Sequence, residues 1–131
     1  MPHFIVEYSD NLERQLDVPA LLELINETAA ATGVFPLGGI RTRAVCHREY
    51  RVADGDPDNA FVYVTVKVGR GREPDVLQAA CETLFAAIEG FVAPLYDSRG
   101  LSLGFDVMEL DTVFAGKKNN IHERLAERRK Q

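Results

Sequence analysis

The feature that most constrains the fold is a strand, helix, strand order that occurs twice along the chain. In the first half, residues 3–8 form a short segment rich in β-forming side chains. Asp17 and Pro19 then suit the N-cap and first turn of a helix whose apolar side chains recur at helical spacing until Gly33. After a stretch rich in glycine and proline, residues 40–46 are typical of a strand. The first half therefore predicts one β-α-β unit.

The second half repeats this order. Residues 61–68 alternate valine with aromatic or polar side chains, which predicts a strand with one fully buried face. Pro74 can open a helix whose apolar positions continue to Leu95, with Pro94 near its end, and residues 101–107 alternate again. Because β-α-β crossovers are right-handed, the two strands of each unit should run parallel. We expect an α+β fold of α/β-type units, with a four-stranded mixed sheet and two helices on one face.

The chain length limits the organisation. At 131 residues it can bury one hydrophobic core and is too short for two ordinary domains. We expect a single domain over residues 1–131, with pseudo-repeats at about 2–50 and 60–112 and a tail at 113–131. The polar residues 53–59 predict an exposed loop, and the charged end of the tail predicts a solvated or subunit-capping helix.

Composition excludes several classes of function. The chain is 46% hydrophobic and 27% charged, and its net charge of -5 argues against a nucleic-acid partner. We find neither a secretory signal nor a membrane-spanning run, so we expect a cytoplasmic protein without a membrane partner. Two cysteines without a Cys/His cluster predict no disulfide and no metal site. A sheet face without helices, if apolar, must be buried by another copy, so an oligomer is expected.

The sequence begins Met1-Pro2 and continues directly into the first predicted strand. Removal of Met1 leaves proline with a free secondary amine, which is a base. Burial and nearby arginines both disfavour its protonated form, which lowers its pKa toward neutrality and suits a general base. Met-Pro alone is a common start. The adjacent strand strengthens the interpretation because it would hold the amine in a fixed position.

Two pairs of arginines could recognise an anion. Arg41 and Arg43 lie two apart on a predicted strand, so they share a face and could clamp carboxylates; the alternative is a solvent-facing strand edge. Arg70 and Arg72 alternate with glycines in the turn after the third strand, which satisfies neither phosphate-loop pattern. Of this pair, Arg72 is the better ligand candidate, although a simple turn with solubilising charges is the alternative.

The remaining polar residues give weaker signals. The three histidines have no metal-ligand spacing, so we interpret them as incidental: His3, His47 and His122. His3 should point to the face of the strand opposite Pro2. Asn119-Asn120 should fix a turn at a subunit contact, and we assign no catalytic role to the tail.

Taken together, these motifs resemble the 5-carboxymethyl-2-hydroxymuconate isomerases of the tautomerase superfamily. The resemblance covers nearly the whole chain and is carried by residues 2–9, 31–43, 53–55, 61–72 and 119–122. It implies a homotrimer without a cofactor that acts in homoprotocatechuate (4-hydroxyphenylacetate) breakdown. It also implies that Pro2 is the catalytic base and that Arg41, Arg43 and Arg72 handle the carboxylates of a small polycarboxylate substrate.

Two other functions stay open at this point. One is a tautomerase-fold enzyme for another unsaturated acid, for example a dehalogenase, which would need an acidic residue to activate water; we find no well-placed candidate. The other is a trimeric module that binds small acids, in which Met1-Pro2 is merely a start site. Retention of Met1 would favour the binding module, because an acylated nitrogen cannot serve as a base.

Overall fold

A computed structural model describes residues 1–111 and 113–130. Residues 112 and 131, the last of the predicted second repeat and of the predicted tail, lie outside the described residues. The elements in chain order are β1 (His3–Ser9), η1 (Asp10–Leu12), α1 (Val18–Ala31), η2 (Leu37–Gly39), β2 (Arg41–His47), β3 (Ala60–Gly69), α2 (Pro74–Ser98), β4 (Leu101–Leu110) and α3 (Ile121–Arg129), where η marks a 3-10 helix.

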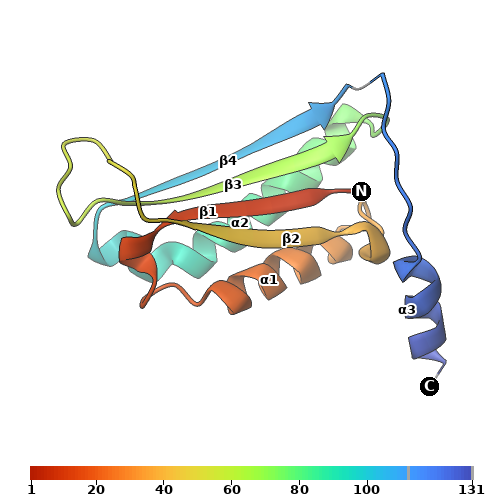
Figure 1. The fold of residues 1–131 in the computed structure, drawn as a ribbon, viewed down its shortest axis with the longest axis horizontal. Helices are drawn as coiled ribbons and strands as arrows, with labels where there is room; N and C mark the ends of the chain where they lie inside the picture. The colour runs from red at the N-terminus through yellow and green to blue at the C-terminus, as the bar shows by residue number, and fades with distance from the viewer. Residues whose placement is uncertain (112, 131) are drawn as a thin grey trace.

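The four strands form one mixed sheet in the order β2-β1-β3-β4. The two strands within each repeat are parallel, and the repeats join through an antiparallel pairing of β1 with β3. Helices α1 and α2 lie side by side on the same face of the sheet (Figure 1). The predicted fold, with four strands in a mixed sheet and two helices on one face, is confirmed.

The two main helices begin where the sequence predicts. Asp17 caps α1 by accepting a hydrogen bond from the Ala20 backbone N–H at 3.1 Å, and Pro19 lies in the first turn. Pro74 opens α2, which continues through Pro94 to Ser98. By length and composition α2 could span a membrane. It packs on the sheet instead, through a buried stripe made of Leu77, Ala80, Leu84, Ile88 and Val92.

The core lies between this helical layer and the sheet. The side chains of β3 that face the helices are fully buried, as the alternation predicts: Val62, Val64, Val66 and Val68. On β1 the buried positions are Phe4, Val6 and Tyr8, which leaves the intervening residues on the opposite face. No helix within the described residues covers that opposite face, which we call the open face (Figure 1). Both cysteines pack, partly buried, against the core.

The C-terminal segment crosses one end of the sheet. From the end of β4, at one edge, the chain runs past the amino terminus to α3, beside the other edge (Figure 1). There α3 packs against η2, and the His122 ring lies so close to Gly38 that a side chain at Gly38 would collide with it. The helix predicted in the tail is therefore present and lies against its own chain.

Candidate active site

Because the two repeats pair in antiparallel fashion, three segments lie together at one end of the sheet: the start of β1, the start of β2 and the end of β3. His3 of β1 lies opposite Arg41 at the start of β2 and opposite Lys67 near the end of β3. The Arg41 backbone N–H donates to the Pro2 carbonyl at 3.0 Å. Consequently the amino terminus lies between the first residue of β2 and the turn that follows β3, which carries Arg72.

Pro2 is buried and held in place on both sides. Its own carbonyl takes part in the β-pairing, and a side-chain carbon on Gly39 would lie 3.7 Å from Pro2 Cδ, in ordinary contact. Pro2 thus lies directly before the first residue of β1, as the sequence predicts, and Met1 is still attached in this structure.

The electrostatics around the amino terminus disfavour a positive charge. Burial is the largest cause that lowers the pKa of the Met1 amine, followed by the charges of Lys117, Arg72 and Arg41. We expect the same surroundings to act on the Pro2 amine after Met1 is removed, since the two nitrogens are one residue apart. The site therefore suits a group that is a neutral base near neutral pH.

Arg41 lies beside the amino terminus and on the open face. Its Nη1 donates to the carbonyls of Gly38 at 3.0 Å and Ile40 at 3.2 Å, and its Nη2 lies 3.7 Å from Met1 Sδ. The next residue, Thr42, faces the helices and bonds the side chain of Asn26, as the strand alternation predicts. Arg41 is thus half-buried, anchored through one nitrogen and directed by the other toward the start of the chain.

Arg72 is the member of its pair that faces the amino terminus. Its guanidinium lies over the Phe35 ring, 5.0 Å from the ring centroid, and its Nη1 donates to the Gly69 carbonyl at 3.3 Å. Phe35 is itself fixed in the core by an edge contact with Phe4. Arg70 instead forms an exposed ion pair with Asp111 at 3.3 Å. Phe35 is a contributor that the sequence analysis does not identify.

Arg43 is connected to this cluster through His3. The Arg43 Nη1 lies 3.0 Å from His3 Nδ1 on the open face. Burial, followed by Arg43, the amino terminus and Arg41, lowers the pKa of His3, so the ring is held in its neutral form. Arg41 and Arg43 do share one face, as the spacing predicts. The charges of Arg41 and Arg72 lower the pKa of the Met1 amine, whereas Arg43 lies two residues farther along β2.

The C-terminal segment adds two residues to which the sequence analysis assigns no site role. Lys117 contributes positive charge at the amine. The Asn119 side chain donates to the Gly38 carbonyl at 2.9 Å, accepts from the Ile121 backbone N–H at 2.8 Å, and lies 3.8 Å from Met1 Sδ. These contacts of Asn119 are made within the chain, and its predicted role at a subunit contact stays a prediction. The available signal was the presence of Asn119 among the residues that carry the family resemblance.

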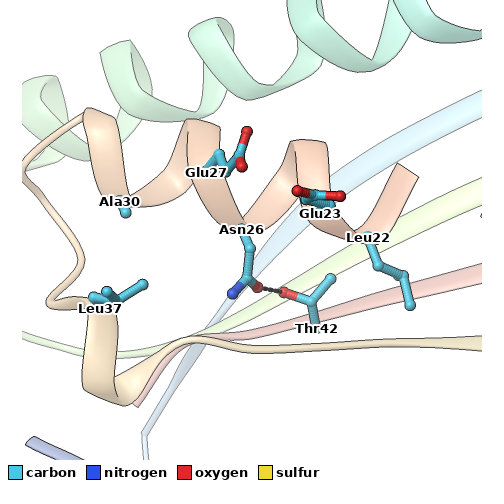
Figure 2. Close-up of a pocket in the computed structure, with 7 residues that line it drawn as sticks. All are labelled: Leu22, Glu23, Asn26, Glu27, Ala30, Leu37 and Thr42. Atoms are coloured by element: carbon cyan, nitrogen blue, oxygen red, sulfur yellow. Dashed lines mark hydrogen bonds between the residues drawn. The ribbon is translucent and has the colours of Figure 1, made fainter. Parts of the chain in front are cut away.

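An open groove on the helical side of the sheet has the wrong charge for a polyanion. It lies between α1 and β2 and includes Glu23 and Glu27 beside the Asn26–Thr42 contact (Figure 2). Two carboxylates would repel a polycarboxylate. Among the residues that the structure describes, no cluster of three His, Cys, Asp or Glu side chains could hold a metal ion. The basic cluster at Pro2 is therefore the stronger candidate.

Comparison with known proteins shows which families and structures this chain resembles. The family model for 5-carboxymethyl-2-hydroxymuconate isomerase matches residues 2–125. The 5-carboxymethyl-2-hydroxymuconate Delta-isomerase of Escherichia coli is 46% identical over 122 residues, which is 93% of this chain and 97% of the relative. A crystal structure of a 5-carboxymethyl-2-hydroxymuconate isomerase from Deinococcus radiodurans R1 is 38% identical with a TM-score of 0.88. Another crystal structure, of a 5-carboxymethyl-2-hydroxymuconate delta-isomerase, is 31% identical with a TM-score of 0.89. Each covers 95% of this chain and 93% of its own.

Proposed function

The chain belongs to the 5-carboxymethyl-2-hydroxymuconate isomerase family, and from this premise we propose that it isomerises 5-carboxymethyl-2-hydroxymuconate with Pro2 as the catalytic base. The observation that carries the proposal is the amino terminus itself. It lies directly before β1, and burial together with three cations lowers the pKa of the Met1 amine found there. An ordinary chain end, exposed and without neighbours, would be protonated at neutral pH.

The reaction needs one base that both removes and returns a proton. Neutral Pro2 takes the proton from the 2-hydroxyl of the substrate, and the oxygen electrons form the new carbonyl while the double bonds shift along the chain. Protonated Pro2 then donates the same proton to carbon 5, which gives the 2-oxo-3-ene isomer and restores the free amine. Atoms and charge balance without a cofactor or a second reactant.

Arginines supply the electrostatic part of this mechanism. The substrate carries three carboxylates, and its dienolate intermediate gains further negative charge. We assign Arg41, Arg43 and Arg72 to the carboxylates, because all three guanidinium groups belong to the segments gathered around Pro2. They would orient the substrate and stabilise the charge that develops. A positive patch on a chain of net charge -5 would also attract such a substrate.

We further propose that the working form is a homotrimer in the cytoplasm that serves homoprotocatechuate breakdown. Large apolar side chains are exposed at the end of β4 and just beyond it: Met108, Leu110, Val113 and Phe114. They adjoin the open face of the sheet, and a neighbouring copy would bury them. The net charge of -5 argues against a nucleic-acid partner, and the apolar helix α2 packs on the core of the sheet.

The test is the ultraviolet time course of 5-carboxymethyl-2-hydroxymuconate conversion by protein whose Met1 has been removed, as verified by mass spectrometry. A Pro2→Ala variant that keeps its oligomeric state is the matched control. We expect conversion by the parent and a fall in kcat of roughly 10²- to 10⁴-fold in the variant, the usual contribution of a general base. No conversion by the processed parent would favour another unsaturated acid or the acid-binding module.

A further inference from the structure

The side-chain amide of Asn119 is locked in one orientation. Its oxygen accepts the Ile121 backbone N–H at 2.8 Å, and its nitrogen donates to the Gly38 carbonyl at 2.9 Å. A flipped amide would place an N–H against an N–H and an oxygen against a carbonyl, so both contacts exclude it. One N–H of the amide is used by Gly38, and the nitrogen lies 3.8 Å from Met1 Sδ.

A second donor converges on the same sulfur. The Arg41 Nη2 lies 3.7 Å from Met1 Sδ, so a guanidinium and an amide both face the methionine side chain. A thioether sulfur is a weak acceptor, whereas a carboxylate oxygen is a strong one that can accept from several donors. Two donors from β2 and the C-terminal segment thus meet at a point that Met1 leaves when it is cleaved.

We propose that Asn119 is a substrate-binding residue, and that Asn119 Nδ2 and Arg41 Nη2 together bind one carboxylate group of the substrate in the position taken by Met1 Sδ. This inference rests on the proposed function for the identity of the substrate. The position adjoins Pro2, so a carboxylate held there would bring the carbon chain of the substrate next to the base. Lys117, two residues earlier, adds positive charge in the same region.

A purely structural role for Asn119 is the alternative, because its hydrogen bonds also tie α3 to η2. His122 offers a matched control. Its ring packs on Gly38, the same residue whose carbonyl Asn119 contacts, yet it offers no donor to Met1 Sδ. A His122→Ala variant therefore loosens the same anchor while both donors at the proposed position remain.

The experiment compares Asn119→Asp, Asn119→Ala and His122→Ala in processed protein, each checked by circular dichroism and gel filtration. Aspartate still accepts the Ile121 N–H, but it loses the donation to the Gly38 carbonyl, which His122→Ala controls for, and it presents negative charge to the substrate. We expect KM to rise by more than about tenfold in Asn119→Asp and less in Asn119→Ala, with kcat changed by under about threefold, as for loss of one charge-assisted contact. His122→Ala should keep the parent KM. An unchanged KM in both Asn119 variants, or an equal rise in His122→Ala, overturns the proposal.

Calorimetric binding of tricarballylate, a saturated tricarboxylate, separates this proposal from the proposed function. If the parent protein does not convert 5-carboxymethyl-2-hydroxymuconate, the proposed function fails, and tricarballylate binding still tests Asn119. Binding that weakens by more than about tenfold in Asn119→Asp but not in His122→Ala supports a carboxylate contact. Equal affinity in all three proteins contradicts it.

Discussion

The two ends of the sheet use similar residues in different ways. At the end that holds Pro2, strands β1 and β2 begin, and Arg41 and Arg72 face the amino terminus. At the opposite end, strands β3 and β4 begin, and Arg99 also lies beside the first residues of a strand pair. The repeat therefore places an arginine near the start of a parallel strand pair twice.

What differs is the partner of the arginine. Arg99 donates to the backbone carbonyls of Asn11 at 3.2 Å and Asp58 at 2.9 Å, and to the Gln15 side chain at 3.1 Å. These contacts join η1 to the loop before β3, so the charge closes that end of the sheet. In Arg41 and in Arg72 one nitrogen donates to backbone carbonyls, two in Arg41 and one in Arg72, and the charge of the guanidinium acts on the amino terminus. Under the proposed function, this difference means that reactivity depends on the terminal amine and not on the repeat.

The largest effect should come from leaving the amine acylated. Protein that retains Met1, or that carries an N-terminal extension, should fold normally and lose activity by roughly 10²- to 10⁴-fold, because an amide nitrogen is no base. Mass spectrometry of the intact protein beside the ultraviolet assay checks this. Full activity with Met1 in place would show that a free Pro2 amine is not needed, and would contradict the proposed difference between the two ends of the sheet.

Exchanging arginine for glutamine at each end should separate activity from stability. Arg41→Gln should lower kcat/KM by about 10- to 100-fold with little change in Tm, since a charge-assisted contact is worth roughly 1.5–3 kcal/mol. Arg99→Gln should lower the free energy of unfolding by about 1–2 kcal/mol and leave kcat/KM unchanged. Thermal unfolding and steady-state kinetics of both variants provide the test. The comparison is wrong if Arg99→Gln also impairs turnover.

A smaller effect concerns the pH profile. The parent kcat/KM should fall as the pH drops through the pKa of the amine, because protonation removes the base. Lys117 lowers the pKa of the Met1 amine, and we expect it to act in the same direction on the Pro2 amine. Lys117→Gln should therefore favour the protonated form and move the acid-side fall of kcat/KM to higher pH. Lys118→Gln, which alters a neighbouring lysine with no such effect on the amine, should leave the profile in place. A profile that does not move in Lys117→Gln contradicts this role.

The smallest effect should come from the acidic loop at the closed end. The Asp54 carboxylate accepts the Asp56 backbone N–H at 3.1 Å and the Asn59 side chain at 2.8 Å, and these bonds lower its pKa. A depressed pKa means that the stabilising contribution is present above the unfolded-state pKa and is lost as pH falls through the folded-state pKa. Asp54→Ala should speed amide hydrogen exchange in residues 53–59 without altering KM. A changed KM would link this loop to the site.

Local patterns predict the fold because each element carries its own signal. The valines of β3 and the Asp17 cap of α1 are examples in which period and capping chemistry suffice. Pro94 is an exception to the usual rule, since α2 continues beyond it to Ser98 while Leu95, in that last stretch, packs partly buried against the core. Propensity therefore decides less than packing at that helix end.

The candidate site is predicted less completely, for a physical reason. Arg41 and Arg72 stand out because their flanking strand and glycine patterns locate them at strand ends. Asn119 reaches Gly38 across 81 residues of sequence, and Lys117 lies in a segment without regular structure. Hydrophobic periodicity in a sequence predicts local elements and carries no signal for contacts between distant segments. The pairing of β1 with β3, which brings the Arg72 turn to Pro2, is likewise a long-range property.

The meeting of the terminal segments at one end of the sheet has a consequence for protein engineering. Circular permutation usually succeeds when the natural ends lie close and new ends open in an exposed loop, and residues 53–59 offer such a loop. In this chain the permuted protein would keep its sheet and its arginines, yet the linker would convert the proline amine into a peptide bond. The permuted chain should therefore keep the fold and lose the proposed activity.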